Sequence, residues 1–413
     1  MTEEHHDPLQ CVMQLRQTLS ADKLSIGFFL GAGCPCAVRI SSGDGDAPII
    51  PDIKGLTARV DTLLLADEAC EPSYQKLKTT FSEDTVESPT IEEILNRIRA
   101  FRDVAGKASV RDLSFAELNH LDRHICRSIR TIVTCALPKE RTPYHALASF
   151  IGSHRSPFTE IFTTNYDVLI EQALESERVP YFDGFVGSSR PFFDQRSIED
   201  GDIPSRWSRL WKLHGSINWG FGKETKVVFR SEHVEDGDEL LIHPSHLKYD
   251  ESRRMPYFVM IDRLRSFLRR SGRPVALVLS GYSFGDEHIN EAIVDSLKAN
   301  ASAACFALQF GNLANYGKAT ALARENANLS VLAADRAVIR RREGPWMASP
   351  TIDPGALKGT FELISGAASS PTDSAASEEL RPCRMSLGEF KRLGAFLDEF
   401  SSYRLPVQSG FTE

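Results

Sequence analysis

The sequence predicts an α/β fold in which a Rossmann-like, mainly parallel sheet carries an inserted helical module. An apolar run at residues 24–30 ends in Gly31-Ala32-Gly33, the pattern of a buried strand that breaks into a tight turn. Residues 54–137 have helical apolar spacing without strand alternation. Further apolar runs, separated by helical patterns as in a sheet covered on both faces, occupy residues 158–163, 210–213, 275–279, 305–310 and 329–333.

The glycine turn after the first strand is a candidate anion site. Gly31 and Gly33 allow the backbone to turn sharply, and Pro35 suits the first turn of a helix. Free N–H groups and the helix dipole would then face a nucleotide pyrophosphate. No third glycine follows at the dinucleotide-binding spacing, so a turn that needs glycine for shape alone is the open alternative.

Composition limits the class of protein. The chain has 413 residues, 42% of them hydrophobic, which is enough for two or three globular domains. Its net charge of -8 argues against direct nucleic-acid binding or a membrane-binding surface. The N-terminus lacks the apolar core of a signal peptide, and no stretch is long enough to span a bilayer. We therefore expect a soluble, cytoplasmic protein.

The eight cysteines are scattered along the chain and are expected to be reduced thiols. Cys34 and Cys36 are the one close pair, and no second cysteine pair accompanies them. A structural zinc site usually needs four ligands in paired spacing, so no metal is expected.

Local signals define the order of elements around the sheet. Residues 9–19 have helical spacing, and the Gly/Asp/Ser-rich residues 41–51 are expected to form a loop long enough to close over a ligand. Inside the helical module, Thr90 with Glu93 and Ser114 with Glu117 have capping-box spacing.

The C-terminal region is expected to be less compact. The Ser/Ala-rich stretch 365–380 predicts a flexible linker, and residues 385–400 have amphipathic helical spacing. A helix of that length is marginal alone, so it should dock on the body or on a partner, and the sequence does not decide between them.

Short polar clusters follow three of the later strands. They are Thr163 to Asp167, His214-Gly215-Ser216 and Ser280 to Asp286. In parallel sheets, ligands bind outside the carboxyl ends of the strands, so these clusters should converge on one site. Taken singly, each cluster is also explained by helix caps or turn residues.

Together the motifs resemble the sirtuin-type NAD-binding domain, over roughly residues 20 to 340. They are Gly-Ala-Gly at 31–33, Thr-Asn-Tyr-Asp at 164–167, Lys-Leu-His-Gly-Ser at 212–216 and Gly-Tyr-Ser-Phe-Gly-Asp at 281–286. More narrowly, they resemble the bacterial antiphage branch, whose members hydrolyse NAD. The implied divisions are an NAD-binding domain (1–53 and 138–345), the inserted helical module (54–137), a linker (346–384) and a C-terminal helix (385–413).

The resemblance implies a role for each matching residue. Asn165 would hold the nicotinamide-side ribose or the attacking water, Asp167 would support that loop, and His214 would be the catalytic base. The residues implied to contact the remainder of NAD are Gly31, Ala32 and Gly33 at the phosphates, Gly281 and Ser283 at the adenosine ribose, and Asp335 near the adenine. Thr164 is implied to bind the cofactor as well.

The implied activity is NAD glycohydrolysis, which releases nicotinamide and ADP-ribose and needs no metal. The paired zinc cysteines of protein-deacylating sirtuins are absent. Their Asp-Phe-Arg motif corresponds at best weakly to Pro51-Asp52. Both departures favour water as the acceptor. The alternatives are an NAD-dependent protein deacylase and a non-catalytic module that binds NAD or ADP-ribose and regulates a partner.

Two kinds of partner are expected, one from the residues and one from the resemblance. The helical module and the C-terminal helix present more amphipathic surface than one sheet needs, which suggests a homo-oligomer. The resemblance adds a separate ATPase, often a HerA-type hexamer, and implies that the isolated protein is weak or silent until triggered. A basic stretch at residues 253–273 is explained as well by a solvated helix face.

Overall fold

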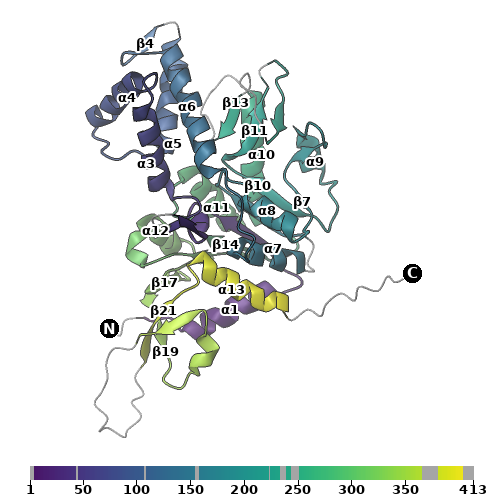
Figure 1. The fold of residues 1–413 in the computed structure, drawn as a ribbon. Coiled ribbons are helices and arrows are strands. Elements are labelled where there is room, and N and C mark those ends of the chain that lie inside the picture. The colour runs from purple at the N-terminus through teal and green to yellow at the C-terminus, as the bar shows by residue number, and fades with distance from the viewer. Residues whose placement is uncertain are drawn as a thin grey trace.

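A nine-stranded sheet forms the centre of the protein (Figure 1). The computed structural model describes residues 4–42, 45–106, 108–153, 158–222, 224–232, 239–242, 251–364 and 380–402. In order across the sheet, the strands are β18 (Arg342–Pro345), β17 (Arg336–Ile339), β16 (Leu329–Leu332), β15 (Ala303–Leu308), β14 (Val275–Ser280), β1 (Ser25–Leu30), β6 (Glu160–Thr163), β10 (Ser208–Lys212) and β7 (Tyr181–Phe182).

The strand order confirms the predicted fold class. The seven strands from β7 at one edge of this sheet to β16 pair in parallel. The last two strands, β17 and β18, are antiparallel additions at the other edge. Counted along the chain, the parallel strands β10, β6, β1, β14, β15 and β16 lie in the doubly wound order 3-2-1-4-5-6. In this order the chain reverses direction across the sheet between β1 and β14. Ligands of such folds bind at that switch point.

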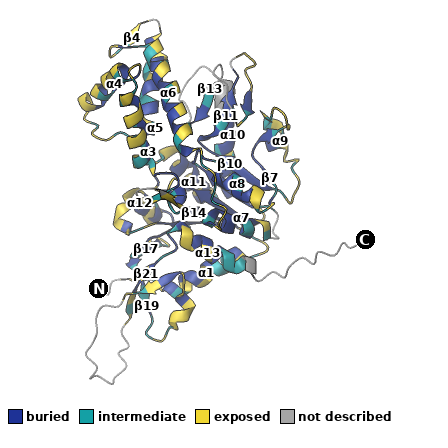
Figure 2. Ribbon diagram, viewed as in Figure 1, coloured by how far each residue is buried: buried dark blue, intermediate teal, exposed yellow. Residues whose placement is uncertain are grey.

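Helices cover both faces of the sheet (Figure 2). Successive side chains of β1 enter two separate cores. Phe28 packs in one core and Phe29 in the other, as strand alternation requires. The helices that surround the sheet are α1 (Pro8–Ser20), α2 (Gly33–Cys36), α7 (Pro143–Ser153), α8 (Leu169–Ser176), α10 (Glu251–Leu268), α11 (Glu287–Ala299) and α12 (Gly317–Glu325).

The inserted module is helical, as predicted, and projects from one end of the sheet (Figure 1). It comprises α3 (Ile53–Ala66), α4 (Glu71–Glu83), α5 (Ile91–Ala105) and α6 (Phe115–Val133), with a short hairpin of β4 (Ser109–Val110) and β5 (Leu113–Ser114). Both predicted capping boxes are present. Arg99 and Arg102 of α5 bind the buried Asp122 of α6 at 2.8 and 2.9 Å, which holds α5 in place.

Two predictions about the backbone were wrong. Strands β2 (Arg39–Ser42) and β3 (Gly45–Pro48) pair in antiparallel fashion, where a loop over residues 41–51 was expected. A second, antiparallel sheet was missed. Its strands are β13 (Glu239–Ile242), β11 (Gly215–Phe221), β12 (Val228–Arg230), β9 (Phe192–Phe193) and β8 (Phe185–Val186), and α9 (Gln195–Asp200) follows β9.

The segment expected as a linker, 346–384, is largely folded where the structure describes it. It contains β19 (Met347–Ala348), η2 (Pro354–Leu357), β20 (Phe361–Leu363) and most of β21 (Arg381–Met385). The three strands form a sheet on which Trp346 and Phe361 are buried in edge contact. The apolar surface that these two rings bury stabilises the segment, although the polar composition around them predicted a linker. Residues 365–379 lie outside the described residues, as do 403–413.

The C-terminal helix α13 (Phe390–Ser402) docks on the body. The ring of Phe390 lies 5.0 Å from Tyr144 of α7, and Phe396 is buried beneath Arg16 of α1. Full burial of one such ring stabilises by about 1.5–3 kcal/mol. Among the described residues, no helix has both the length and the apolarity to cross a membrane.

Candidate active site

Glycine backbones pack against each other at the switch point. Gly31 follows β1, Gly281 follows β14, and the amide of Gly33 donates to the carbonyl of Gly281 at 2.9 Å. A Cβ on Gly31 would lie 2.3 Å from that carbonyl oxygen, and Gly281 has φ +66°. The amide of Gly31 donates to Ser280. Shape alone therefore explains these glycines, and the amides of Gly31 and Gly33 are engaged rather than open to a phosphate.

Asn165 and the glycine turn are in direct contact. The side-chain amide of Asn165 donates to the carbonyl of Gly31 at 3.1 Å, and its backbone amide donates to Thr163 Oγ1 at 3.0 Å. Thr163 Oγ1 in turn donates to the carbonyl of Leu30 at 2.8 Å. Two strand ends are thus joined through one threonine, as the strand-end clusters predicted.

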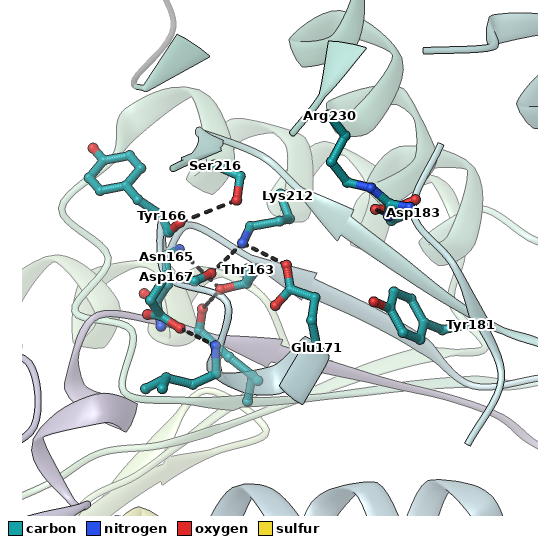
Figure 3. Close-up of polar contacts among 12 residues, drawn as sticks. Thr163, Asn165, Tyr166, Asp167, Glu171, Tyr181, Asp183, Lys212, Ser216 and Arg230 are labelled. Carbon is teal, nitrogen blue, oxygen red and sulfur yellow. Dashed lines mark hydrogen bonds and ion pairs between the residues drawn. The ribbon is translucent and has the colours of Figure 1, made fainter. Parts of the chain in front are cut away.

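Lys212 holds the loop that contains Asn165 (Figure 3). Its buried ammonium donates to the backbone carbonyl of Asp167 and pairs with Glu171 of α8 at 2.8 Å. The carboxylate of Asp167 accepts from the amide of Leu169, the first residue of α8, at 3.0 Å. Asp167 therefore supports the loop, in line with its predicted role, whereas Lys212 was not predicted.

We expect Lys212→Met to destabilise the protein. The variant keeps the side-chain volume but leaves Glu171 buried without its cation, which costs about 3–5 kcal/mol for a buried pair. Urea unfolding should show this loss, and the double variant Lys212→Met/Glu171→Leu should recover part of it because both charges are gone. A single variant as stable as the parent would contradict the role given to Lys212.

His214 lies between two carboxylates at the start of β11. Its Nε2 is 2.9 Å from Asp286 Oδ2, and its Nδ1 is 3.7 Å from Glu92 Oε1. Asp286 also caps α11, since its other oxygen accepts from the amide of Ile289. Glu92 comes from the first turn of α5 and also accepts from the hydroxyl of Tyr166 at 2.6 Å. The helical module therefore supplies part of this site.

The two neighbouring carboxylates shift the pKa of His214. Burial alone lowers the pKa of an imidazole, but the hydrogen bond to Asp286 and the nearby Glu92 raise the pKa of His214 to about 9. The raised pKa favours the protonated ring near neutral pH. The role of His214 as the catalytic base therefore stays a prediction, and the neighbouring carboxylates of Asp286 and Glu92 are alternative proton acceptors.

Stability should depend on pH through His214. Its pKa is raised from 6.5 to about 9 on folding, so the ion pairs stabilise fully below pH 6.5 and lose that effect as the pH rises through 9. The free energy of unfolding should fall by about 3 kcal/mol over this window. Chemical denaturation as a function of pH would show it, and His214→Gln should flatten the profile. An equally steep profile in that variant would assign the titration to another group.

A small pocket lies between the sheet and the helical module, with a volume of about 60 Å³. Predicted residues on its sheet side are Ala32, Thr164, Asn165 and Asp167. The opposite wall includes Glu92, together with Ile53, Leu56 and Val133 of α3 and α6. This volume is well below the roughly 300 Å³ of small-molecule sites, so a dinucleotide requires the pocket to open.

The remaining predicted residues lie apart from this pocket. Gly281 contacts the glycine turn from the β14 side, and Ser283 is exposed. Asp335 follows β16 and accepts from the amide of Leu313 at 2.8 Å. They occupy the same carboxyl edge of the sheet, but no described contact joins Ser283 or Asp335 to Asn165.

Sequence reasoning missed Glu92 and saw Asp286 only as a helix cap. Glu92 stands beside the capping residue Glu93, so an acidic first turn already explained it. The available signal was weak: one helix start with two adjacent glutamates, of which the capping box uses one.

Comparison with known proteins supports the sirtuin resemblance over part of the chain. Residues 159–331 match the family model described as a SIR2-like domain. This span includes the motifs at 164–167, 212–216 and 281–286, and leaves out the glycine turn and the helical module. No curated protein matches the chain.

Solved structures of Sir2 proteins match more of the chain at low identity. One is described as "Structural Basis for the Mechanism and Regulation of Sir2 Enzymes", with 13% identity, coverage of 73% of this chain and 85% of that chain, and a TM-score of 0.34. Another is a serine-to-alanine Sir2 homologue in complex with ADP-ribose, with 14% identity, coverage of 72% and 84%, and a TM-score of 0.31.

Proposed function

We propose that the chain cleaves the N-glycosidic bond of NAD and releases nicotinamide and ADP-ribose. The observation that carries this proposal is the pocket at the sheet edge, where the Asn165 amide and the Glu92 carboxylate line one space within reach of the glycine turn. The SIR2-like match over residues 159–331 supports the same reading.

The side chains suit this reaction. Departure of neutral nicotinamide leaves a positively charged, oxocarbenium-like ribosyl centre, which an ionised carboxylate stabilises. Glu92 would supply that charge, and Asn165 would orient the ribose or the attacking water without adding charge. Water then bonds to the anomeric carbon and loses one proton, and Glu92 would accept it. His214 would position Glu92 rather than act as the base.

The closed pocket also bears on control of activity. Its outer wall belongs to the helical module, so access requires this module to move relative to the sheet. An oligomer or a HerA-type ATPase partner, both suggested by the resemblance, would provide such a trigger. We therefore propose that the reaction depletes NAD during antiphage defence and stays off in the free chain.

The test is nicotinamide and ADP-ribose release from NAD, measured by chromatography. Purified chain is assayed alone and with a co-purified ATPase, beside an acetylated-peptide arm and calorimetric measurement of NAD binding. Release that depends on Asn165 supports a glycohydrolase. Peptide deacetylation without net hydrolysis would indicate a deacylase, and binding without release under any condition would indicate a regulatory module.

A further inference from the structure

Three metal-ligating side chains converge in the helical module, away from the pocket. Asp67 and Cys70 belong to the turn between α3 and α4, and His124 belongs to α6. One potential ligand atom from each lies within 4.8 Å of the others. Such convergence of three different donors from two distant parts of the sequence is not required by helix packing alone.

We propose that Asp67, Cys70 and His124 form a binding site for a zinc-type transition-metal ion. A thiolate, an imidazole and a carboxylate are the donors that Zn²⁺ takes, whereas Mg²⁺ and Ca²⁺ take oxygen ligands. The inference is independent of the proposed NAD chemistry.

The distances are close to those of a metal site. Oxygen and nitrogen ligands at about 2.0–2.1 Å from a tetrahedral zinc lie roughly 3.3 Å apart. Asp67 Oδ2 and His124 Nε2 are 2.9 Å apart, about half an ångström closer than two such ligands of one zinc ion. All three donor atoms lie within 4.8 Å of one another, so side-chain shifts would bring them to the distances of a single ion. The other oxygen of Asp67 accepts from the amides of Ala69 and Cys70, which fixes the orientation of the carboxylate.

The surroundings of His124 also suit a ligand. Its second ring nitrogen, Nδ1, lies 3.5 Å from Ser128 Oγ, and metal-bound histidines commonly bond an oxygen on that side. Cys70 is fully buried, while the side chains of His124 and Asp67 are 27% and 35% exposed, which leaves a path for an ion.

The spacing supplies a candidate for a fourth ligand. His120 precedes His124 by one helical turn on α6, and the two rings lie 6.2 Å apart. Asp67 and Cys70 are separated by two residues and the histidines by three, which is the paired spacing of zinc sites with one carboxylate in place of a thiolate. The cysteine-based expectation of no metal overlooked this mixed set.

Cobalt substitution tests the site in the full chain, prepared without a polyhistidine tag. Titration with Co²⁺ should saturate at one ion per chain with a thiolate-to-cobalt absorption band, and Zn²⁺ should displace it. Cys70→Ser should lose the band. Cys126→Ser removes another buried thiol of the same module and should keep it. His124→Gln should weaken Co²⁺ binding by at least about tenfold.

Two results would overturn the proposal. One is a parent chain that shows no thiolate band at stoichiometric Co²⁺, in which case Asp67 only bonds the turn amides and His124. The other is an unchanged band in Cys70→Ser. Because a variant could fail to fold, circular dichroism of each protein accompanies the titration, and the parent result alone suffices to reject the site.

Discussion

Asn165→Ala should lower the rate of nicotinamide release by roughly 100- to 1,000-fold, the usual cost of removing one group that orients the reacting atoms. Asn165 is the predicted site residue that both lines the pocket and contacts the glycine turn. The measurement is kcat under whichever condition activates the parent protein.

The fold should survive this change. The lost hydrogen bond to the Gly31 carbonyl costs about 1 kcal/mol, which is a small shift in unfolding free energy. Asn300→Ala is a matched control, because its amide also donates to backbone carbonyls, those of Leu268 and Arg270, but far from the pocket. A folded Asn165→Ala protein with full activity would refute the assignment of this pocket.

The parts of the fold that were predictable are those coded by local pattern. Buried strands such as β1 and β14 are continuous apolar runs, and the capping boxes of α5 and α6 specify where each helix begins. The doubly wound order then follows from few alternatives, because parallel strands need crossover connections. The strand-end rule placed Asn165 and Asp167 correctly at one edge.

The second sheet had no such pattern. Three of its strands, β8, β9 and β12, have two or three residues each, too few for alternation to be visible. The folded part of the predicted linker was missed for the same reason, because β19 has two residues and β20 has three. Their stability comes from rings such as Trp346, which pack against distant residues.

The candidate site was only half predictable for a related reason. His214 meets Asp286, which lies 72 positions further along the chain, and Glu92 from the helical module. Nothing in the helical period of α5 tells which face meets the sheet. Without that contact, a lone histidine before a glycine indicated a turn residue, and its role as a base was implied by the resemblance alone.

Glu92→Gln should lower kcat by about 100-fold or more, since it removes the carboxylate proposed to oppose the ribosyl charge and accept the proton from water. The amide keeps the size of the side chain and its reach toward Tyr166, so the protein should still fold. The free energy of unfolding should fall somewhat, because the carboxylate beside the buried His214 is lost. Glu87→Gln, an exposed glutamate of the same module, is the matched control.

A second readout separates this role from a merely structural one. Glu92 is one of the groups that raise the pKa of His214, so Glu92→Gln should lower the pH at which the imidazole titrates in NMR spectra. Asp286→Asn should lower it as well, but should leave the carboxylate that lines the pocket in place. If Asp286→Asn lowered kcat as much as Glu92→Gln does, the charge of His214 would determine the rate. A much larger loss in Glu92→Gln would place the chemistry on the carboxylate of the helical module.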